Sequence, residues 1–251
     1  SMPKLLKATI NSKTLEYTIS GSGEPTIVLV NGSGGPIEGW YKVFAGLEML
    51  GTVFAYNRLG MGGSDKPSEP QTGSRIVTTL HQLLADVGLP PPYVLVGHSL
   101  GGLYVNLFAR MFPEDVAGVA LLDATAPEDV LQLPQENSGF QRLTQSILNL
   151  IFGKDIYGET AHLDQTVSEI QKAAPFPNIP LMVVSGGNPS RMTPDKVRHI
   201  RSRNQQLLTA LSPQGRQVIA AESGHFPQFT EPTIVIQAIR DIVEMSMPIN
   251  I

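Results

Sequence analysis

The run Gly-His-Ser-Leu-Gly at positions 97–101 is the part of the sequence whose residue types and spacing best fit a chemical role. It follows a predicted strand, 93–97, and leads into a stretch of helical periodicity, 100–111. Glycines on both sides of a serine leave room for a sharp strand-to-helix turn, which exposes the hydroxyl at a helix N-terminus. The pattern therefore predicts that Ser99 is a nucleophile at the carboxyl edge of a sheet.

A serine hydroxyl becomes a good nucleophile only when a nearby base removes its proton. The chain has five histidines, and His225 is the best candidate for this base. It lies in a polar loop directly after the predicted strand 217–221, so we expect it at the same sheet edge as Ser99. The other four lie in amphipathic helices, inside the serine turn or in a predicted insertion: His81, His199, His98 and His162.

The elements that must position these residues alternate along the chain. Continuous apolar runs are typical of strands buried on both faces of a parallel sheet, and they occur at 26–30, 53–57, 93–97, 116–122, 181–185 and 217–221. Helical stretches lie between or after them, at 40–49, 74–87, 100–111, 193–211 and 232–245. Residues 4–10 and 15–19 suit an antiparallel edge hairpin. The pattern predicts an α/β fold with a mostly parallel central sheet and helices on both faces.

One interval, 125–177, interrupts this alternation because it contains no predicted strand. Apolar residues recur in it at helical spacing, namely Phe140, Leu143, Ile147, Leu150 and Ile151. Segments at the carboxyl ends of parallel strands usually carry the site, so we expect a helical lid over a pocket, with ordinary core packing as the alternative. The predicted organisation is a core domain of residues 1–124 and 178–251 and a lid insertion of residues 125–177.

The motifs together resemble those of the α/β-hydrolase fold family, over residues 26–245. The similarity covers the serine turn, the Gly-His-x-Pro run at 224–227, the arginine-and-glycine turn at 55–64 (AYNRLGMGGS) and the loop at 31–36 (NGSGGP). The resemblance implies an oxyanion hole made by the backbone N–H groups of Ser33 and Leu100. The family most often has histidine where this chain has Asn31, a difference that bears on how the oxyanion loop is anchored.

The remaining member of a serine triad is a carboxylate that orients the imidazole. In many members of the family it follows the strand predicted here at 181–185, in the pattern Gly-x-x-Asp-x-x-x-Pro, but this chain has Ser190 at the aspartate position. A subset of the family carries its acid one strand earlier. Asp123 ends the apolar run 118–123 (GVALLD), where a carboxylate needs a partner because unpaired burial is costly.

We therefore expect Asp123 to be the triad acid, which also gives the family's chain order of serine, acid and histidine. A structural carboxylate that binds backbone amides at the entrance of the lid is the alternative role for Asp123. Asp195 is the reserve candidate, although it is better placed to open the helix that follows Pro194. Glu222 is less favoured because it is too close to His225 in sequence.

Composition narrows the possible function classes. The absence of cysteine excludes a disulfide scaffold and a thiol nucleophile, and without a His-Glu-x-x-His motif we expect no metal and no cofactor. A net charge of −4 does not favour nucleic-acid binding, and no apolar run approaches the ~20 residues that a membrane-spanning helix needs. The N-terminus has no apolar signal region, so we expect a cytoplasmic protein; its oligomeric state is left open.

Ser99, His225 and Asp123 together predict a serine hydrolase that forms an acyl-enzyme. An apolar lid and the lack of an obvious charge clamp favour a small or medium carboxylic ester as the small-molecule substrate. Phe140 in the lid and Phe226 beside the base are candidate substrate-binding residues. Two alternatives stay open: hydrolysis of an amide or carbon–carbon bond by the same triad, and a non-catalytic small-molecule receptor built on the fold.

Overall fold

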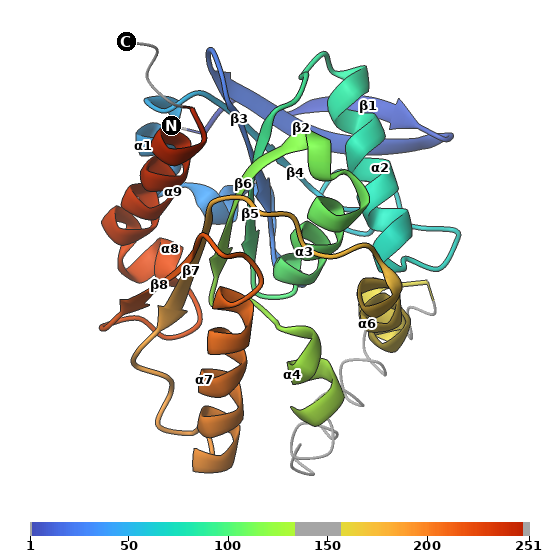
Figure 1. The fold of residues 1–251 in the computed structure, drawn as a ribbon. Coiled ribbons are helices and arrows are strands. Elements are labelled where there is room, and N and C mark those ends of the chain that lie inside the picture. Colours follow the sequence, from blue (N-terminus) through green and yellow to red (C-terminus); the bar gives the residue numbers. More distant parts are fainter. Residues whose placement is uncertain (1, 134–156, 248–251) are drawn as a thin grey trace.

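The computed structural model describes residues 2–133 and 157–247, which are arranged around one central sheet (Figure 1). In its described part the sheet has eight strands in the order β1-β2-β4-β3-β5-β6-β7-β8. The pairs β1–β2 and β2–β4 are antiparallel, and every other neighbouring pair is parallel. The strands are β1 (Leu6–Ile10), β2 (Lys13–Gly21), β3 (Thr26–Val30), β4 (Thr52–Tyr56), β5 (Tyr93–His98), β6 (Val116–Leu122), β7 (Leu181–Gly186) and β8 (Gly215–Ala220).

Helices cover both faces of this sheet (Figure 1). The α-helices are α1 (Phe44–Glu48), α2 (Gly73–Asp86), α3 (Gly101–Met111), α4 (Pro127–Gln132), α6 (Leu163–Lys172), α7 (Asp195–Thr209), α8 (Pro227–Thr230) and α9 (Pro232–Ser246). The 3-10 helices are η1 (Ile37–Trp40), η2 (Pro113–Asp115) and η4 (Glu159–His162). This confirms the predicted mostly parallel α/β sheet with helices on both faces, although several element ends are shifted by a few residues.

The core is divided by the sheet into two apolar layers. Successive residues of a strand point to opposite faces, so Ile27 and Leu29 of β3 pack with α1 and α9, whereas Val28 and Val30 pack with α2 and α3. Every residue of β3, β4 and β5 is buried. The continuous apolar runs of the sequence are therefore explained by burial on both faces of the sheet.

The described part of segment 125–177 contains α4, η4 and α6. Helix α6 packs against α2 and α3 with Thr166, Val167 and Ile170 buried, so the end of this segment forms part of a core layer. Helix α4 contacts α7, and both lie beyond the carboxyl ends of the central strands (Figure 1). The predicted lid helix, including Phe140, lies outside the described residues, and the boundary of the lid stays a prediction.

The turn from β5 into α3 brings two segments of backbone into close approach. Ser99 has a φ of 53°, in the left-handed region that disfavours side chains. A Cβ added at Gly101 would lie 2.3 Å from the carbonyl oxygen of Val30 and 2.6 Å from that of Asn31. Glycine at position 101 is therefore required for α3 to begin directly against the end of β3.

Replacing this glycine should destabilise the fold. We expect Gly101→Ala to lower the free energy of unfolding by about 1–3 kcal/mol, because the new methyl group must displace backbone. Urea unfolding followed by circular dichroism measures this loss. Gly39→Ala is a matched control, since its Cβ would meet its nearest neighbour at an ordinary 3.4 Å. An equal loss of unfolding free energy in the two variants would contradict the conclusion that the backbone around Gly101 leaves no room for a side chain.

Candidate active site

Ser99 lies at the tip of the β5–α3 turn, where its neighbours hold the backbone in place. Its N–H donates to the carbonyl of Leu122 at 3.2 Å, and its own carbonyl accepts from the N–H groups of Gly102 and Thr125, each at 2.9 Å. These bonds connect the strained turn to β6 and to the start of α3. The Ser99 hydroxyl oxygen then lies 2.8 Å from Nε2 of His225.

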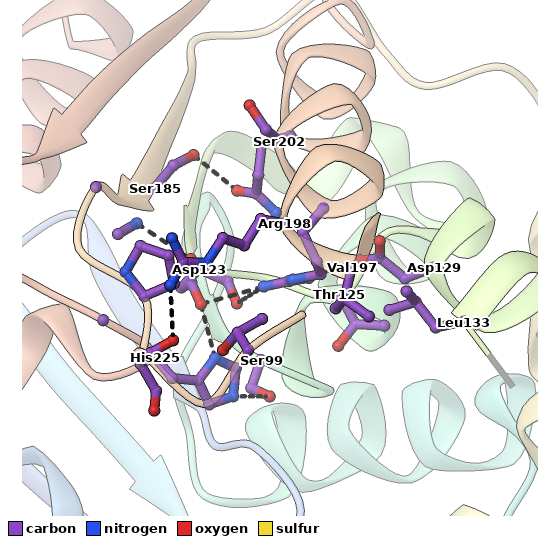
Figure 2. Close-up of a pocket in the computed structure, with 18 of the residues that line it drawn as sticks. Ser99, Asp123, Thr125, Asp129, Leu133, Ser185, Val197, Arg198, Ser202 and His225 are labelled. Carbon is purple, nitrogen blue, oxygen red and sulfur yellow. Dashed lines mark hydrogen bonds and ion pairs between the residues drawn. The ribbon is translucent and has the colours of Figure 1, made fainter. Parts of the chain in front are cut away.

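His225 follows β8 and bridges the serine to a carboxylate. Its Nδ1 lies 2.7 Å from Oδ2 of Asp123, so Ser99, His225 and Asp123 form one hydrogen-bonded chain (Figure 2). The three residues come from three different strand ends, 24 and 102 positions apart along the chain. The structure thus brings together the three residues that were selected from the sequence. The carboxylate bonded to His225 is that of Asp123.

The His225 loop is held from two sides. His98, which is 4% exposed, donates from Nε2 to the carbonyl oxygen of His225 at 2.6 Å. Burial lowers the pKa of His98 to about 4, so this side chain is neutral near pH 7. On the other side, Oε1 of Glu231 accepts from the N–H of Glu222 at 2.9 Å and from the hydroxyl of Ser223 at 2.6 Å.

Asp123 follows β6 in a left-handed conformation, with a φ of 40°. Its Oδ1 accepts from the N–H of Gly186 at 3.1 Å, and its Oδ2 accepts from His225 and, at 3.1 Å, from Arg201. Burial by itself would raise the pKa of this carboxyl, but the bonds from His225, Arg201 and Gly186 outweigh burial and hold the pKa below its ordinary value. Asp123 is therefore ionised at neutral pH.

Arg201 is a residue of the site that the sequence analysis missed. From α7, its terminal nitrogens reach the Asp123 carboxylate, the carbonyl oxygens of Asp123 and Ala124 at 3.2 and 3.1 Å, and Oδ2 of Asp129 at 2.6 Å. Asp129 is 3% exposed and also accepts from Asn204 at 2.8 Å. Arg201 thus ties the turn after β6 to α4 and α7. Its only sequence signal was a basic residue in an amphipathic helix, which does not indicate a partner.

The loop predicted to supply the oxyanion hole is anchored by polar side chains. The Nδ2 of Asn31 donates to the carbonyl of Pro36 at 2.9 Å, and Oδ1 accepts from Nε1 of Trp40 at 2.6 Å. Arg58 donates to the carbonyl oxygens of Asn31 and Gly32 at 2.6 and 3.0 Å. Asn31 therefore spans its own loop, which explains how this chain anchors it without the histidine that is common in the family.

Arg58 is itself paired with Glu159, another contact that the sequence did not reveal. Nε and NH2 of Arg58 form a two-pronged contact with the carboxylate, at 2.7 and 2.9 Å. Burial alone would lower the pKa of Arg58, but the charge of Glu159 outweighs it and raises the pKa above its ordinary value. The ion pair therefore fastens the oxyanion loop to η4, at the end of segment 125–177.

The predicted oxyanion-hole residues Ser33 and Leu100 both lie in segments next to the nucleophile. Leu100 directly precedes α3, and a Cβ added at Gly32 would lie 3.0 Å from Cβ of Ser99, which places the loop before Ser33 against the nucleophile. Neither the N–H of Ser33 nor that of Leu100 donates to an acceptor within the described part of the chain. Both amides are therefore available to an external acceptor.

A cavity of about 990 Å³ opens beside this chain of residues, and its lining includes Ser99, Asp123 and His225 (Figure 2). Phe226 does not line it. The Phe226 ring packs instead against His98 and His225, with ring centroids at 4.9 and 5.2 Å, and its side chain is 48% exposed. Phe140 lies outside the described residues.

The rival carboxylates have other surroundings. Asp195 opens α7 as its first residue and is exposed, as the helix-opening role predicts. Ser190, at the family's usual acid position, accepts through its hydroxyl from the N–H of Met192 at 3.2 Å. Glu222 lies at the start of the His225 loop, and its N–H donates to Glu231. Since Nδ1 of His225 is bonded to Asp123, neither rival carboxylate is its partner.

The residues that the structure describes offer neither a metal-binding cluster nor a membrane-spanning helix. Among them, no group of three or more histidine or carboxylate side chains is close enough to hold a metal ion. In the same part of the chain, no helix has the length and apolar character needed to cross a membrane.

Comparisons with known proteins agree with this architecture. The model of the alpha/beta hydrolase family matches residues 27–238. YqjL of Bacillus subtilis (strain 168) is 28% identical over 225 residues, which cover 88% of this chain and 85% of YqjL. The enol-lactonase of Burkholderia xenovorans LB400 has a TM-score of 0.68 and 20% identity, and the match covers 95% of this chain and 99% of that one.

A thermophilic esterase from Thermogutta terrifontis is similar to the same extent, with a TM-score of 0.67 and 20% identity over 98% of this chain and 100% of the esterase. At such identities the solved structures show the shared fold. The family model, in contrast, matches most of the sequence and contains the strands that carry the chain of Ser99, His225 and Asp123. The protein therefore belongs to the α/β-hydrolase family.

Proposed function

We propose that the protein is a serine hydrolase that cleaves a small or medium carboxylic ester through an acyl-enzyme. The observation that carries this proposal is the continuous chain from the Ser99 hydroxyl through His225 to Asp123, with contacts of 2.8 and 2.7 Å. These distances allow direct proton transfer from the hydroxyl to the imidazole. A buried, ionised carboxylate on the far side of the ring stabilises the imidazolium that this transfer produces.

In the first half of the reaction, Ser99 Oγ attacks the ester carbonyl carbon while Nε2 of His225 accepts its proton. The carbonyl oxygen becomes an oxyanion, which the N–H groups of Ser33 and Leu100 stabilise. Collapse of this intermediate breaks the bond to the alcohol, which leaves with the proton from His225. In the second half, His225 deprotonates a water molecule that attacks the acyl-enzyme, and the acid product leaves as Ser99 regains its proton.

The likeness to an esterase and a lactonase supports ester chemistry, although those structures share only the fold with this chain. We also propose that segment 125–177 contributes a lid, that Phe140 contacts substrate, and that the protein works in the cytoplasm on a small molecule without a cofactor. Phe226 is not proposed as a substrate contact, because its ring packs against His98 and His225 and does not line the cavity. The same triad serves amide and carbon–carbon hydrolases. The receptor alternative rests on the serine at position 190, and the bond between Asp123 and His225 supports the hydrolase instead.

Removing the nucleophile should abolish turnover while the fold stays intact. We expect Ser99→Ala to lower kcat for p-nitrophenyl butyrate by about 10⁴-fold or more, as triad deletions do elsewhere. It should also lose labelling by a fluorophosphonate probe, with peptide mapping of the wild type placing the label on Ser99. Ser68→Ala, at an exposed loop serine, is the control. Labelling of any other residue would refute the mechanism.

The identity of the acid can be tested with a pair of amide substitutions. Asp123→Asn keeps the shape of the side chain but removes the charge that fixes the imidazole, so we expect kcat to fall by about 10⁴-fold. Asp195→Asn should stay within a few-fold of the wild type. Steady-state kinetics on the same ester measure both values, and a larger loss in Asp195→Asn than in Asp123→Asn would contradict our assignment.

Stability should depend on pH through His98. Its folded pKa of about 4 lies below the ordinary 6.5, so the unfolded chain binds this proton first as the pH falls. Stability is therefore lost between about pH 6.5 and pH 4, by about 3 kcal/mol for this group. Urea unfolding of the wild type and of His98→Gln should show a shallower slope in the variant. The exposed His199→Gln is the control, and parallel slopes for the wild type and His98→Gln would rule the effect out.

A further inference from the structure

The cavity beside Ser99 is lined by charged groups, and all but one of them form ion pairs with one another. Two aspartates and two arginines contribute to the lining: Asp123, Asp129, Arg198 and Arg201. Arg201 bonds to both aspartates, and the remaining carboxylate oxygens accept from Gly186 and Asn204. Each of these three charges therefore already has its partners within the protein.

Arg198 is different. It lies three positions before Arg201 on α7, on the same side of the helix, and its NH2 makes a bond of 3.2 Å to the carbonyl of Ser190. Its Nε is buried and has no hydrogen-bond partner among the residues that the structure describes. No carboxylate of the described chain lies within ion-pair distance of its guanidinium. Buried polar atoms nearly always have partners, so the unpaired Nε at this cavity wall is open to an acceptor from outside the chain.

Polar groups accompany Arg198 at this wall of the cavity. The bond to Ser190 fixes the guanidinium against the loop that leads into α7, and the hydroxyl-bearing residues Thr193 and Ser202 line the same cavity. Figure 2 shows Arg198 and Ser202 projecting from α7 on the side of Asp123 and His225. A ligand that contacts this wall therefore shares one cavity with the nucleophile.

We propose that Arg198 binds a free carboxylate on the substrate, so that the enzyme acts on esters or lactones whose acyl part carries a second, unesterified carboxylate. This inference rests on the proposed hydrolase function and specifies its substrate class. A guanidinium matches the planar carboxylate with two parallel donors. Arg201 is already bonded to Asp123 and Asp129, whereas Arg198 forms no ion pair within the described residues, so Arg198 is the guanidinium of this cavity that is left to bind a carboxylate.

The chemical consequence is positioning. A carboxylate bound at Arg198 takes no part in bond cleavage, but it fixes one end of the acyl chain and thereby limits where the ester carbon can lie relative to Ser99. Arg198 could not be recognised from the sequence as a charge clamp, because it lies in a helix rich in polar residues. Its position at the cavity wall follows from how α7 packs in the fold. The expected substrate therefore differs from a simple apolar ester in carrying a charge remote from the reacting bond.

The test compares esters that differ only in this charge. The p-nitrophenyl hemiesters of succinate, glutarate and adipate are each paired with the corresponding p-nitrophenyl methyl diester, in which the carboxylate is capped. We expect wild-type kcat/KM to favour the charged member of at least one pair by about 10–100-fold. Arg198→Met should reduce that ratio to about one, and Arg198→Lys should retain part of it. Arg203→Met, which removes an exposed charge from the same helix, should leave the ratio unchanged.

The outcomes separate the two proposals. Equal rates on both members of every pair in the wild type would overturn the carboxylate site and leave the hydrolase intact, and this result does not depend on any variant folding. A preference that survives in Arg198→Met would overturn the role of Arg198. Preference for a terminal phosphonate over the carboxylate would overturn the ligand class. No hydrolysis of any ester, together with no fluorophosphonate labelling of Ser99, would instead refute the proposed function itself.

Discussion

The site depends on the requirement that a buried carboxylate be fully hydrogen-bonded. Asp123 stands at the end of β6 with its side chain 14% exposed, and it meets this requirement with groups from three separate elements. The N–H of Gly186 belongs to the end of β7, Arg201 to α7 and the imidazole of His225 to the loop after β8. Loss of any one would leave a desolvated charge incompletely compensated. The same interaction that makes Asp123 tolerable in the interior therefore also orients the imidazole against Ser99.

His225 bonds to Asp123 at the end of β6, so the loop after β7 supplies no partner for the imidazole. Residues 187–194 follow β7, where many family members carry the acid, but here this loop carries Ser190, which supports a local turn and holds Arg198 through its carbonyl. The loop forms part of the wall of the cavity. A serine at position 190 thus coincides with an arginine at the cavity wall that bonds to this loop, which is the arrangement on which the proposed carboxylate site rests.

The features that could be predicted from the sequence are those that depend on residues close together in the chain. Continuous apolar runs identified the central strands, and Gly-x-Ser-x-Gly identified the turn at Ser99, because those signals depend on neighbouring residues. Asp123 was found because an aspartate after an apolar run needs a partner. The bonds of Arg201 to Asp123, of Arg58 to Glu159 and of His98 to the His225 carbonyl were not predicted. These contacts join residues far apart in sequence, and helical periodicity does not say which neighbour a polar side chain will meet.

Two arginines, the buried Arg58 and the partly buried Arg201, have comparable roles near the nucleophile. Arg58 binds the carbonyl oxygens of the oxyanion loop and is neutralised by Glu159, whereas Arg201 binds the turn of Asp123 and is neutralised by Asp123 and Asp129. Each guanidinium binds backbone carbonyls next to the site, and each is held in an ion pair with carboxylates of the chain. Arg198 forms no ion pair with any described residue, and this difference, rather than its proximity to the site, is the reason to assign it to the substrate.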